Sequence, residues 1–354
     1  MRLSATLEPL APDRPDEAID AFLRNSPFAA YQQTRAWAAA APARARQDWW
    51  VFRAHAGGAL AGAAIVRRTR LGLGYALATV QRGPIVHDPA LFGPVLAALG
   101  ERLAAIRCCS AQLGPRARGR ALPAMAEALR GHGFAPLPAD RQPLHETTGI
   151  VWLDKPEEAI LAGFKQRGRR QIRTAEKAGV AIRAVAGEAD LRTYQAVLDA
   201  FAAARPGYDM GGQPDAAGQA RLIAANGGAM LLAECDGRAI GAHAFVRQAD
   251  EAIWLSLATT SDAPQIPRGY LLLWEGMRRA RALGSVGYDL AGLPLEGARG
   301  EGEAGREQFK TAFAPHRRIM PPMHVAALAP LPHLLLFGAR QLWRQGAAMA
   351  RARG

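Results

Sequence analysis

The sequence has little cysteine and little lysine, and it has no long apolar run. Its three cysteines, Cys108, Cys109 and Cys235, show no CxxC spacing, so neither a zinc cluster nor a disulfide framework is indicated. No stretch approaches the roughly 20 apolar residues that span a bilayer. The N-terminal residues lack the basic, apolar and small-residue segments of a secretory signal. We therefore expect a cytoplasmic protein without a transmembrane segment.

Signatures of metal and cofactor enzymes are missing as well. The eight histidines form no HxxxH or HxH pair with carboxylates, and there is neither a GxSxG elbow nor a Walker loop. Acetyltransferases that use CoA normally carry a Q/R-x-x-G-x-G/A loop, whose backbone amides hold the pyrophosphate. Neither RLGLG at 70–74 nor QIPRGY at 265–270 fits that pattern. The sequence predicts no metal and no bound cofactor, and it argues against CoA as an acyl donor.

The chain is strongly basic. Lysine and arginine total 44 against 31 acidic residues, which gives a formal charge of +13 and a pI near 10.5. Such an excess favours a polyanionic partner, for example nucleic acid, a nucleotide-bearing substrate or an acidic membrane surface. A general preference for arginine explains the total equally well, because the lysines are only Lys155, Lys165, Lys177 and Lys310. Only the positions of the charges along the chain can therefore distinguish a polyanion-binding protein from one that is merely rich in arginine.

The length and the order of elements predict two similar α/β halves. A chain of 354 residues fits two domains of roughly 150 residues each. In the first half, strand patterns and helix patterns alternate. They are strands over 49–66, 75–86 and 109–113 and helices over 90–106 and 121–132. The same order recurs in the second half, with helices over 156–178, 188–204 and 270–283 and strands over 230–234, 239–247, 253–259 and 286–290.

Basic residues cluster most densely in FKQRGRRQIRTAEKAGV, residues 164–180. On a helix, Phe164, Gly168, Ile172 and Ala175 form one apolar stripe. The other side of the helix then carries a broad arc of basic residues. Glu176 is the single acidic residue in the segment 164–180. We call Lys165, Arg167, Arg169, Arg170, Arg173 and Lys177 the basic arc. A helix face of one sign is typical of phosphate binding, although a solvated surface helix remains the alternative.

Four stretches resemble a known family. They are SPFAAYQQTRAW (26–37), QRGPIV (81–86), FKQRGRRQIRTAEKAGV (164–180), and YLLLWEGMRRARALGSVGYDLAG with REQFKTAF (270–292 and 306–313). Their order and spacing over nearly the whole chain resemble the Fem aminoacyltransferases, which move amino acids from aminoacyl-tRNA onto the peptide stem of peptidoglycan precursors.

The resemblance implies a fold of two tandem acetyltransferase-like (GNAT-like) α/β domains with mixed, mostly antiparallel sheets. Domain 1 would comprise 1–150 and 321–354, with the C-terminal tail packed back on it, and domain 2 would comprise 151–320. The first domain would hold the acceptor in a cleft and the second the aminoacyl-tRNA 3′ end in a channel. The basic arc is the candidate tRNA-binding surface. Lys310 falls on the family's functional lysine and Arg82 on the basic residue before its Gly-Pro. Arg82, with Gln33 and Trp37 of the first matching stretch, is a candidate substrate-binding residue.

The acceptor side departs from the family pattern. Gly114-Pro115 replaces an Asp-Pro, and Leu257 in IWLSL replaces an acceptor-contacting tyrosine. Tyr208, in RPGYDMGG at 205–212, is the remaining candidate contact there. A small amine or a peptide natural product is therefore an alternative to a peptidoglycan precursor as acceptor.

Aminolysis of an activated ester needs alignment and charge stabilisation more than a strong base. The candidate bases are Asp289, His243 and His316. Two other functions fit parts of the sequence, namely a CoA-dependent N-acyltransferase of the same fold and a non-catalytic RNA-binding protein. We expect a monomer, with a loop over 292–306 beside the site. The C-terminal 330–353 is expected to form an amphipathic helix packed on the first domain, with peripheral membrane contact as the alternative.

Overall fold

The computed structural model describes residues 3–11, 14, 16–138, 141–143, 145–205, 212–293 and 303–335. These residues form two compact units, which are described separately below. The first unit comprises the described residues within 1–38, 43–144 and 321–354, and the second those within 39–42 and 145–320. The predicted boundary at 150 falls inside strand β8 (Thr147–Trp152), which belongs to the second sheet because it pairs with strand β13 (Gly287–Gly292).

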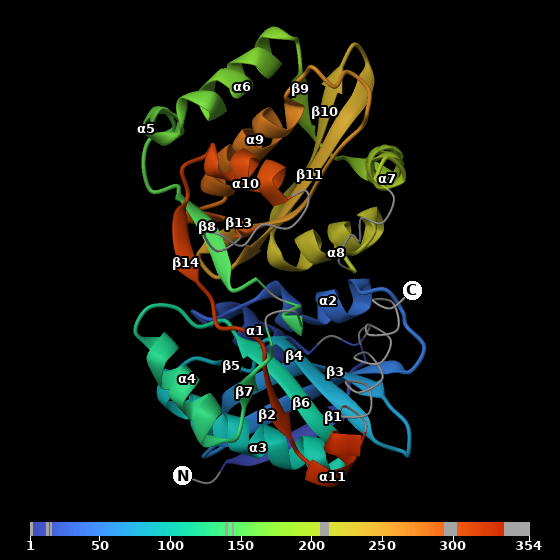
Figure 1. Cartoon of the computed structure of the whole chain (residues 1–354), viewed down its shortest axis with the longest axis vertical. Coiled ribbons are helices and arrows are strands. Elements are labelled where there is room, and N and C mark those ends of the chain that lie inside the picture. Colours follow the sequence, from blue (N-terminus) through green and yellow to red (C-terminus); the bar gives the residue numbers. More distant parts are fainter. Residues whose placement is uncertain are drawn as a thin grey trace, which may run out of the picture. The chain divides into compact units, whose positions relative to one another are not determined.

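The first unit is built on an eight-stranded sheet with the strand order β1-β2-β3-β4-β6-β15-β7, and β5 pairs with β3 (Figure 1). The strands are β1 (Ser4–Pro9), β2 (Gln47–Ala56), β3 (Ala59–Arg70), β4 (Ala76–Arg82), β5 (Ile85–Val86), β6 (Cys108–Pro115), β7 (Ala135–Pro136) and β15 (His324–Ala327). The helices are α1 (Glu17–Asn25), η1 (Tyr31–Gln33), α2 (Arg35–Ala40), η2 (Pro89–Leu91), α3 (Phe92–Ala105), α4 (Ala121–Gly131) and α11 (Pro330–His333). The pairing of β15 with β6 confirms that the C-terminal part of the chain packs back on the first domain.

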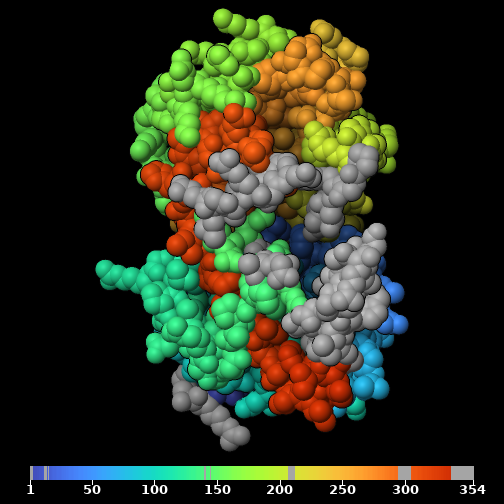
Figure 2. Space-filling model, in the orientation of Figure 1, coloured from blue at the N-terminus to red at the C-terminus, as the bar shows by residue number. Residues whose placement is uncertain are grey.

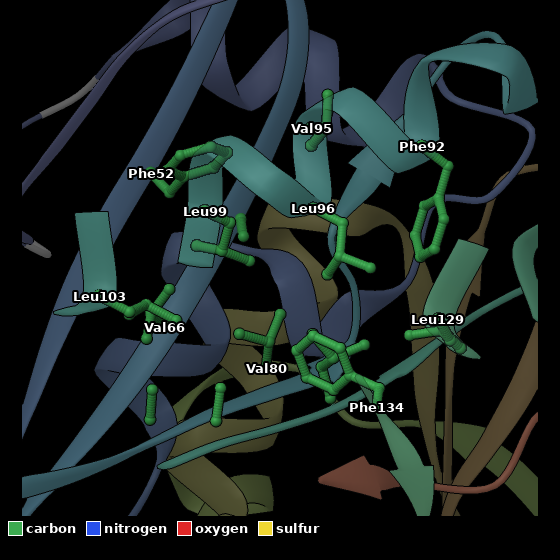
Figure 3. Packing of buried hydrophobic residues seen from close by; sticks show 14 of the residues in the cluster. Phe52, Val66, Val80, Phe92, Val95, Leu96, Leu99, Leu103, Leu129 and Phe134 are labelled. Atoms are coloured by element: carbon green, nitrogen blue, oxygen red, sulfur yellow. The ribbon is translucent and has the colours of Figure 1, made fainter. Parts of the chain in front are cut away.

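Helix α3 supplies one side of the first core. Its apolar residues Phe92, Val95, Leu96, Leu99 and Leu103 recur at helical spacing and are all buried. They pack with residues of the sheet and of α4 (Figure 3). The labelled partners are Phe52, Val66, Val80, Leu129 and Phe134. The apolar period of the sequence thus fixes which face of this helix is covered.

The second unit has a seven-stranded sheet with the order β14-β8-β13-β12-β11-β10-β9. The remaining strands are β9 (Ala181–Ala184), β10 (Gly228–Cys235), β11 (Arg238–Gln248), β12 (Glu251–Thr259) and β14 (His316–Ile319). The helices are α5 (Glu157–Gly163), α6 (Gln166–Lys177), α7 (Gly187–Ala203), α8 (Ala216–Asn226), α9 (Arg268–Ala282) and α10 (Glu303–Thr311). Helices α6 and α9 lie on one side of this sheet and α7 and α8 on the other (Figure 1).

One predicted helix differs from the structure, and two predicted segments lie mostly outside the described residues. The single helix expected over 156–178 is two helices, α5 and α6, because Phe164 and Lys165 take extended backbone angles between them. Most of the loop expected over 292–306 and of the C-terminal helix expected over 330–353 lies outside the described residues. Among the helices of the described residues, none combines the length and the apolar character needed to cross a membrane.

Candidate active site

The second sheet opens between its two parallel strands. Strands β12 and β13 pair only over Glu251–Ile253 and Gly287–Asp289. Beyond these residues β12 remains paired with β11 and β13 remains paired with β8, where Gly292 pairs with Thr148. In the first unit the parallel strands β4 and β6 stay together over the whole of β4. An opening where parallel strands part is a usual place for a ligand in α/β proteins.

Lys310 lies at this opening. It comes from the last turn of α10, and its Nζ donates a hydrogen bond to the carbonyl oxygen of Gly292 at 2.7 Å. The same Nζ lies 4.8 Å from the ring centroid of Trp254 on β12, so the side chain spans the two parted strands. Burial lowers the pKa of Lys310 to about 8, against the opposing effect of the Asp289 carboxylate and with a smaller contribution from Arg306. The ammonium is therefore poised to lose or regain a proton near neutral pH.

The negative charge of Asp289 acts on this lysine. Its side chain is buried, and Oδ1 accepts hydrogen bonds from the Thr148 hydroxyl and, at 2.8 Å, from the amide of Ala291. These donors fix the carboxylate at the point where β13 leaves β12. The geometry suits a fixed charge that acts on Lys310 better than a base that must turn towards an incoming amine.

Aromatic and aliphatic side chains surround the ammonium. Trp254 and Leu257 of β12 face the same side as Phe309 of α10, and Tyr270 of α9 continues the cluster. The ring centroids of Trp254 and Phe309 are 6.0 Å apart, and those of Tyr270 and Phe309 are 4.7 Å apart. Because such walls exclude water, a charge placed among them acts more strongly on a reacting group.

The loop before α9 is closed on itself by a buried arginine. The Arg268 guanidinium donates to four backbone carbonyl oxygens, those of Ile240, Thr260, Ala263 and Ile266. The amides of Ile266, Arg268 and Tyr270 are bonded to carbonyls of the same loop. These three amides are therefore not free to hold a pyrophosphate.

Helix α6 presents the predicted apolar stripe to the protein. Gly168, Ile172 and Ala175 of α6 are buried, and so is Phe164, which precedes the helix, so the predicted burial of these four positions is confirmed. Gly168 lies so close to the carbonyl oxygen of Ala312 that a Cβ would approach it to 2.6 Å. The basic helix therefore packs directly on the segment that follows Lys310.

Not all of the basic arc is available to a partner. Arg169 is half-buried and donates to the carbonyl oxygens of Ala162 and Phe164, so it caps the end of α5. Arg167 donates through Nε to the Tyr270 hydroxyl at 3.3 Å. The exposed members of the arc are Lys165, Arg167, Arg170, Arg173 and Lys177. Their helix lies at the surface in the light-green part of Figure 2.

Comparison with known proteins agrees with this architecture. Residues 162–311 match the model of the acetyltransferase (GNAT) domain family. The crystal structure of FemX superposes with a TM-score of 0.75 over 94% of this chain and 99% of that chain, at 16% identity. The chain has a FemX-like tandem GNAT fold. No match was found among curated protein sequences.

Two further structures share the fold. A tandem GNAT protein from the clavulanic acid biosynthesis pathway has a TM-score of 0.54 at 13% identity and covers 92% of this chain and 99% of its own. The C-terminal domain of a putative lysylphosphatidylglycerol synthetase from Agrobacterium fabrum has a TM-score of 0.52 at 15% identity, covering 75% and 81%. At these identities the likeness establishes the FemX-like fold, and the chemistry has to come from the site.

Within the FemX-like fold, His243 is a poor candidate for a base. Its ring is fully buried, with Nδ1 bonded to the Ser256 carbonyl at 2.7 Å and Nε2 to the Tyr288 hydroxyl at 2.6 Å. Burial lowers its pKa to about 4, so the neutral ring is a weak base. We therefore assign His243 a structural role. His316 is exposed on β14, and Tyr208 lies outside the described residues.

The predicted acceptor contacts of the first unit divide into two kinds. Gln33 is fully buried and bonds to the backbone of Ile65 and of Gln81, so it holds β3 and β4 rather than a substrate. Arg82 is buried and donates to the Pro321 carbonyl at 3.4 Å. Trp37 is half-buried and lines a small pocket, which leaves it as the candidate contact of the three.

Sequence reasoning missed two residues of the second site, Trp254 and Arg268. Both lie in stretches already singled out, IWLSL and QIPRGY, but only Leu257 was named in the first and no residue in the second. An arginine at the start of the predicted helix over 270–283 is the signal that could have identified Arg268.

Proposed function

We propose that the protein is an aminoacyltransferase that moves an aminoacyl group from aminoacyl-tRNA to an amine and forms an amide. The observation that carries the proposal is the half-buried Lys310 ammonium at the opening between β12 and β13. The second unit binds the donor in this proposal, and the first binds the acceptor. The acceptor is a peptidoglycan precursor or a small-molecule or peptide amine.

The reaction follows from the position of that charge. The acceptor nitrogen attacks the ester carbonyl carbon, a C–N bond forms, and the C–O bond to the ribose breaks. The proton lost by the nitrogen ends on the ribose oxygen. Negative charge develops on the carbonyl oxygen and on the leaving oxygen, and the Lys310 ammonium stabilises it. With a pKa of about 8, Lys310 can also give its proton to the leaving oxygen and recover one from the amine.

The exposed arc of α6 supports tRNA as the donor, because clustered cations displace counterions from phosphates. Replacing Arg170, Arg173 and Lys177 with Ala is expected to weaken tRNA binding about tenfold or more and to flatten its salt dependence. These side chains are exposed, so the melting temperature is expected to stay nearly constant. Filter binding over a series of salt concentrations measures both quantities.

The matched control replaces Arg192, Arg221 and Arg238, three exposed arginines elsewhere in the second unit. It removes the same charge but leaves α6 intact. Equal losses of affinity in the two triple variants would mean that net charge, and not the α6 surface, holds the tRNA.

A CoA-dependent N-acyltransferase is the second candidate, favoured by the match of 162–311 to the acetyltransferase domain. The missing pyrophosphate-loop pattern and the engaged amides of Ile266, Arg268 and Tyr270 argue against it. Calorimetry with CoA and with acetyl-CoA is expected to detect no binding at micromolar concentrations. A micromolar dissociation constant for either ligand would favour this candidate over the tRNA-dependent one.

A direct test of the activity uses a pool of radiolabelled aminoacyl-tRNAs together with a cell extract. The expected result is a labelled product that survives mild base, since an amide resists the hydrolysis that destroys the ester. A non-catalytic RNA-binding protein, the third candidate, would bind charged and uncharged tRNA alike and consume neither.

A further inference from the structure

The second site holds a cation for the ester oxygens, but its buried groups offer no good base for the amine. The Asp289 carboxylate is held by its hydrogen-bond donors, and His243 is fully buried with a pKa of about 4. Lys310 takes up no proton while it acts as an ammonium. The proton of the attacking nitrogen therefore needs an acceptor at the surface of the site.

His145 lies against the residue that holds Lys310. It comes two residues before β8, and β8 pairs with β13, which ends at Gly292 (Figure 1). A Cβ on Gly292 would lie 2.1 Å from Nδ1, 2.2 Å from Cγ and 2.4 Å from Cε1 of His145, and these are the three atoms nearest to that point. Because three atoms of one ring are almost equally near, a flat face of the imidazole covers the α carbon of Gly292.

Gly292 brings the imidazole and the ammonium together. Its α carbon contacts His145, and its carbonyl oxygen accepts the hydrogen bond from Lys310 Nζ at 2.7 Å. These two atoms of one residue are about 2.4 Å apart. The close approach of the ring requires glycine, since any side chain would displace it. One group that can accept a proton and one that can give a proton thus meet at a single residue.

The two groups differ in their exposure to water. His145 is exposed, whereas Lys310 is half-buried. An exposed ring can be reached by an incoming amine and can exchange protons with water between turnovers. A half-buried charge acts more strongly on a reacting group than one in bulk water does. Exposure thus suits His145 to proton transfer and Lys310 to charge stabilisation.

The elements next to His145 carry charges of both signs. Their charged and titratable residues are Glu146, Asp289 on β13, Arg306, Glu307 and Lys310 on α10, and His316, Arg317 and Arg318 on β14. Both arginines of β14 are bound to carboxylates. The Asp289 carboxylate and the Lys310 ammonium attract each other. Since neither sign dominates, we expect the ring to change its charge at a pH usual for an imidazole.

We propose that His145 is the general base of the transfer reaction, a role that rests on the function proposed above. As the acceptor nitrogen attacks the ester carbonyl carbon and the C–N bond forms, one N–H proton passes to a ring nitrogen of His145. The C–O bond to the ribose breaks, and the leaving oxygen takes a proton from the Lys310 ammonium. The imidazolium then returns its proton to Lys310 through water, which restores both groups.

His145→Gln tests this role, because the amide is polar and similar in size but takes up no proton at neutral pH. Single-turnover transfer from saturating aminoacyl-tRNA is expected to slow about a hundredfold or more. The tRNA affinity and the melting temperature are expected to stay near those of the parent, since the side chain is exposed. The matched control is His132→Gln, at an exposed histidine that follows α4 in the first unit, and we expect it to keep the rate.

The pH profile separates a base from a merely structural residue. In the parent the transfer rate is expected to rise between about pH 6 and 7, where an ordinary imidazole loses its proton and becomes a base. This rise is expected to be absent in His145→Gln, whereas the fall through about pH 8 that belongs to Lys310 remains. A rise that persists in His145→Gln would belong to the acceptor amine or to another group and would overturn the role.

Gly292→Ala tests the placement of the ring. The variant keeps the carbonyl oxygen that binds Lys310, but its methyl group displaces the imidazole. We expect it to slow transfer about tenfold or more in the parent and to have little effect in His145→Ala, where the ring is gone. Equal slowing in both backgrounds would show that Gly292 acts independently of His145 and would overturn the placement.

The outcomes distinguish this role from the function on which it rests. A parent protein that transfers no aminoacyl group would overturn the proposed function and the role together. An active parent whose rate is matched by His145→Gln within about threefold would overturn the role of His145 alone.

Discussion

Replacing Lys310 with Met is expected to slow aminoacyl transfer by roughly a hundredfold or more, on the order of 3 kcal/mol in the transition state. The methionine keeps most of the aliphatic stem beside Trp254, so packing changes little. What is lost is the charge on the reacting ester. Single-turnover transfer from saturating aminoacyl-tRNA, with tRNA affinity measured in parallel, separates the chemical step from binding. A transfer rate within about threefold of the parent would show that Lys310 takes no part in the chemical step.

Arginine at this position distinguishes the two roles of the lysine. Lys310→Arg keeps a positive charge but not a group that titrates near pH 8, so we expect partial rescue. In the parent the ammonium is the active form, and a fall in the transfer rate as pH rises through about 8 is expected. This fall is expected to be absent in Lys310→Arg. An identical pH profile in both proteins would assign the titration to another group.

Replacing Glu251 with Gln is expected to destabilise the protein by about 3 kcal/mol. Glu251 is fully buried at the start of β12, and Arg318 of the edge strand β14 binds both of its oxygens, at 2.6 and 2.9 Å. The amide of Gln removes the negative charge, so the Arg318 guanidinium loses the carboxylate that binds it. Glu251 lies where β12 and β13 are still paired. Urea denaturation measures the change in the free energy of unfolding.

Glu275→Gln is the matched control, because Glu275 pairs with Arg278 and Arg279 in more exposed positions on α9. We expect it to cost less than about 1 kcal/mol. The double variant Glu251→Leu with Arg318→Met is expected to recover most of the stability, since it leaves no unpaired charge. Equal urea midpoints for Glu251→Gln and Glu275→Gln would show that the buried Glu251–Arg318 pair stabilises the protein no more than the exposed pairs of Glu275.

Local patterns determined much of the fold. The apolar period of α3 and the stripe Phe164, Gly168, Ile172 and Ala175 identify buried helix faces, because neighbours on a helix are set by spacing alone. The strands predicted over 239–247 and 253–259 correspond to β11 and β12, and the helix predicted over 270–283 corresponds to α9. Short strands such as β9 and β15 were missed, since they are too short to show a period and exist only through pairing with distant strands.

The site depended on contacts that no local pattern contains. The sequence placed Lys310 in a candidate motif, but its bond to Gly292 and its contact with Trp254 join positions far apart in the chain. The same holds for Arg169. Its helical position predicted a side chain in solvent, but in the structure it donates a hydrogen bond to the carbonyl oxygen of Phe164 at the end of α5.

What the sequence alone determined is the order of the elements, their buried faces and the excess of positive charge, because these depend on spacing and composition. What only the tertiary structure decided is which charges have partners. The side chain of Gln33 bridges two strands and that of Arg268 binds backbone carbonyls around its loop, and both outcomes depend on where other strands end. Burial and pairing, which set the pKa and the reactivity of a side chain, belong to that three-dimensional arrangement.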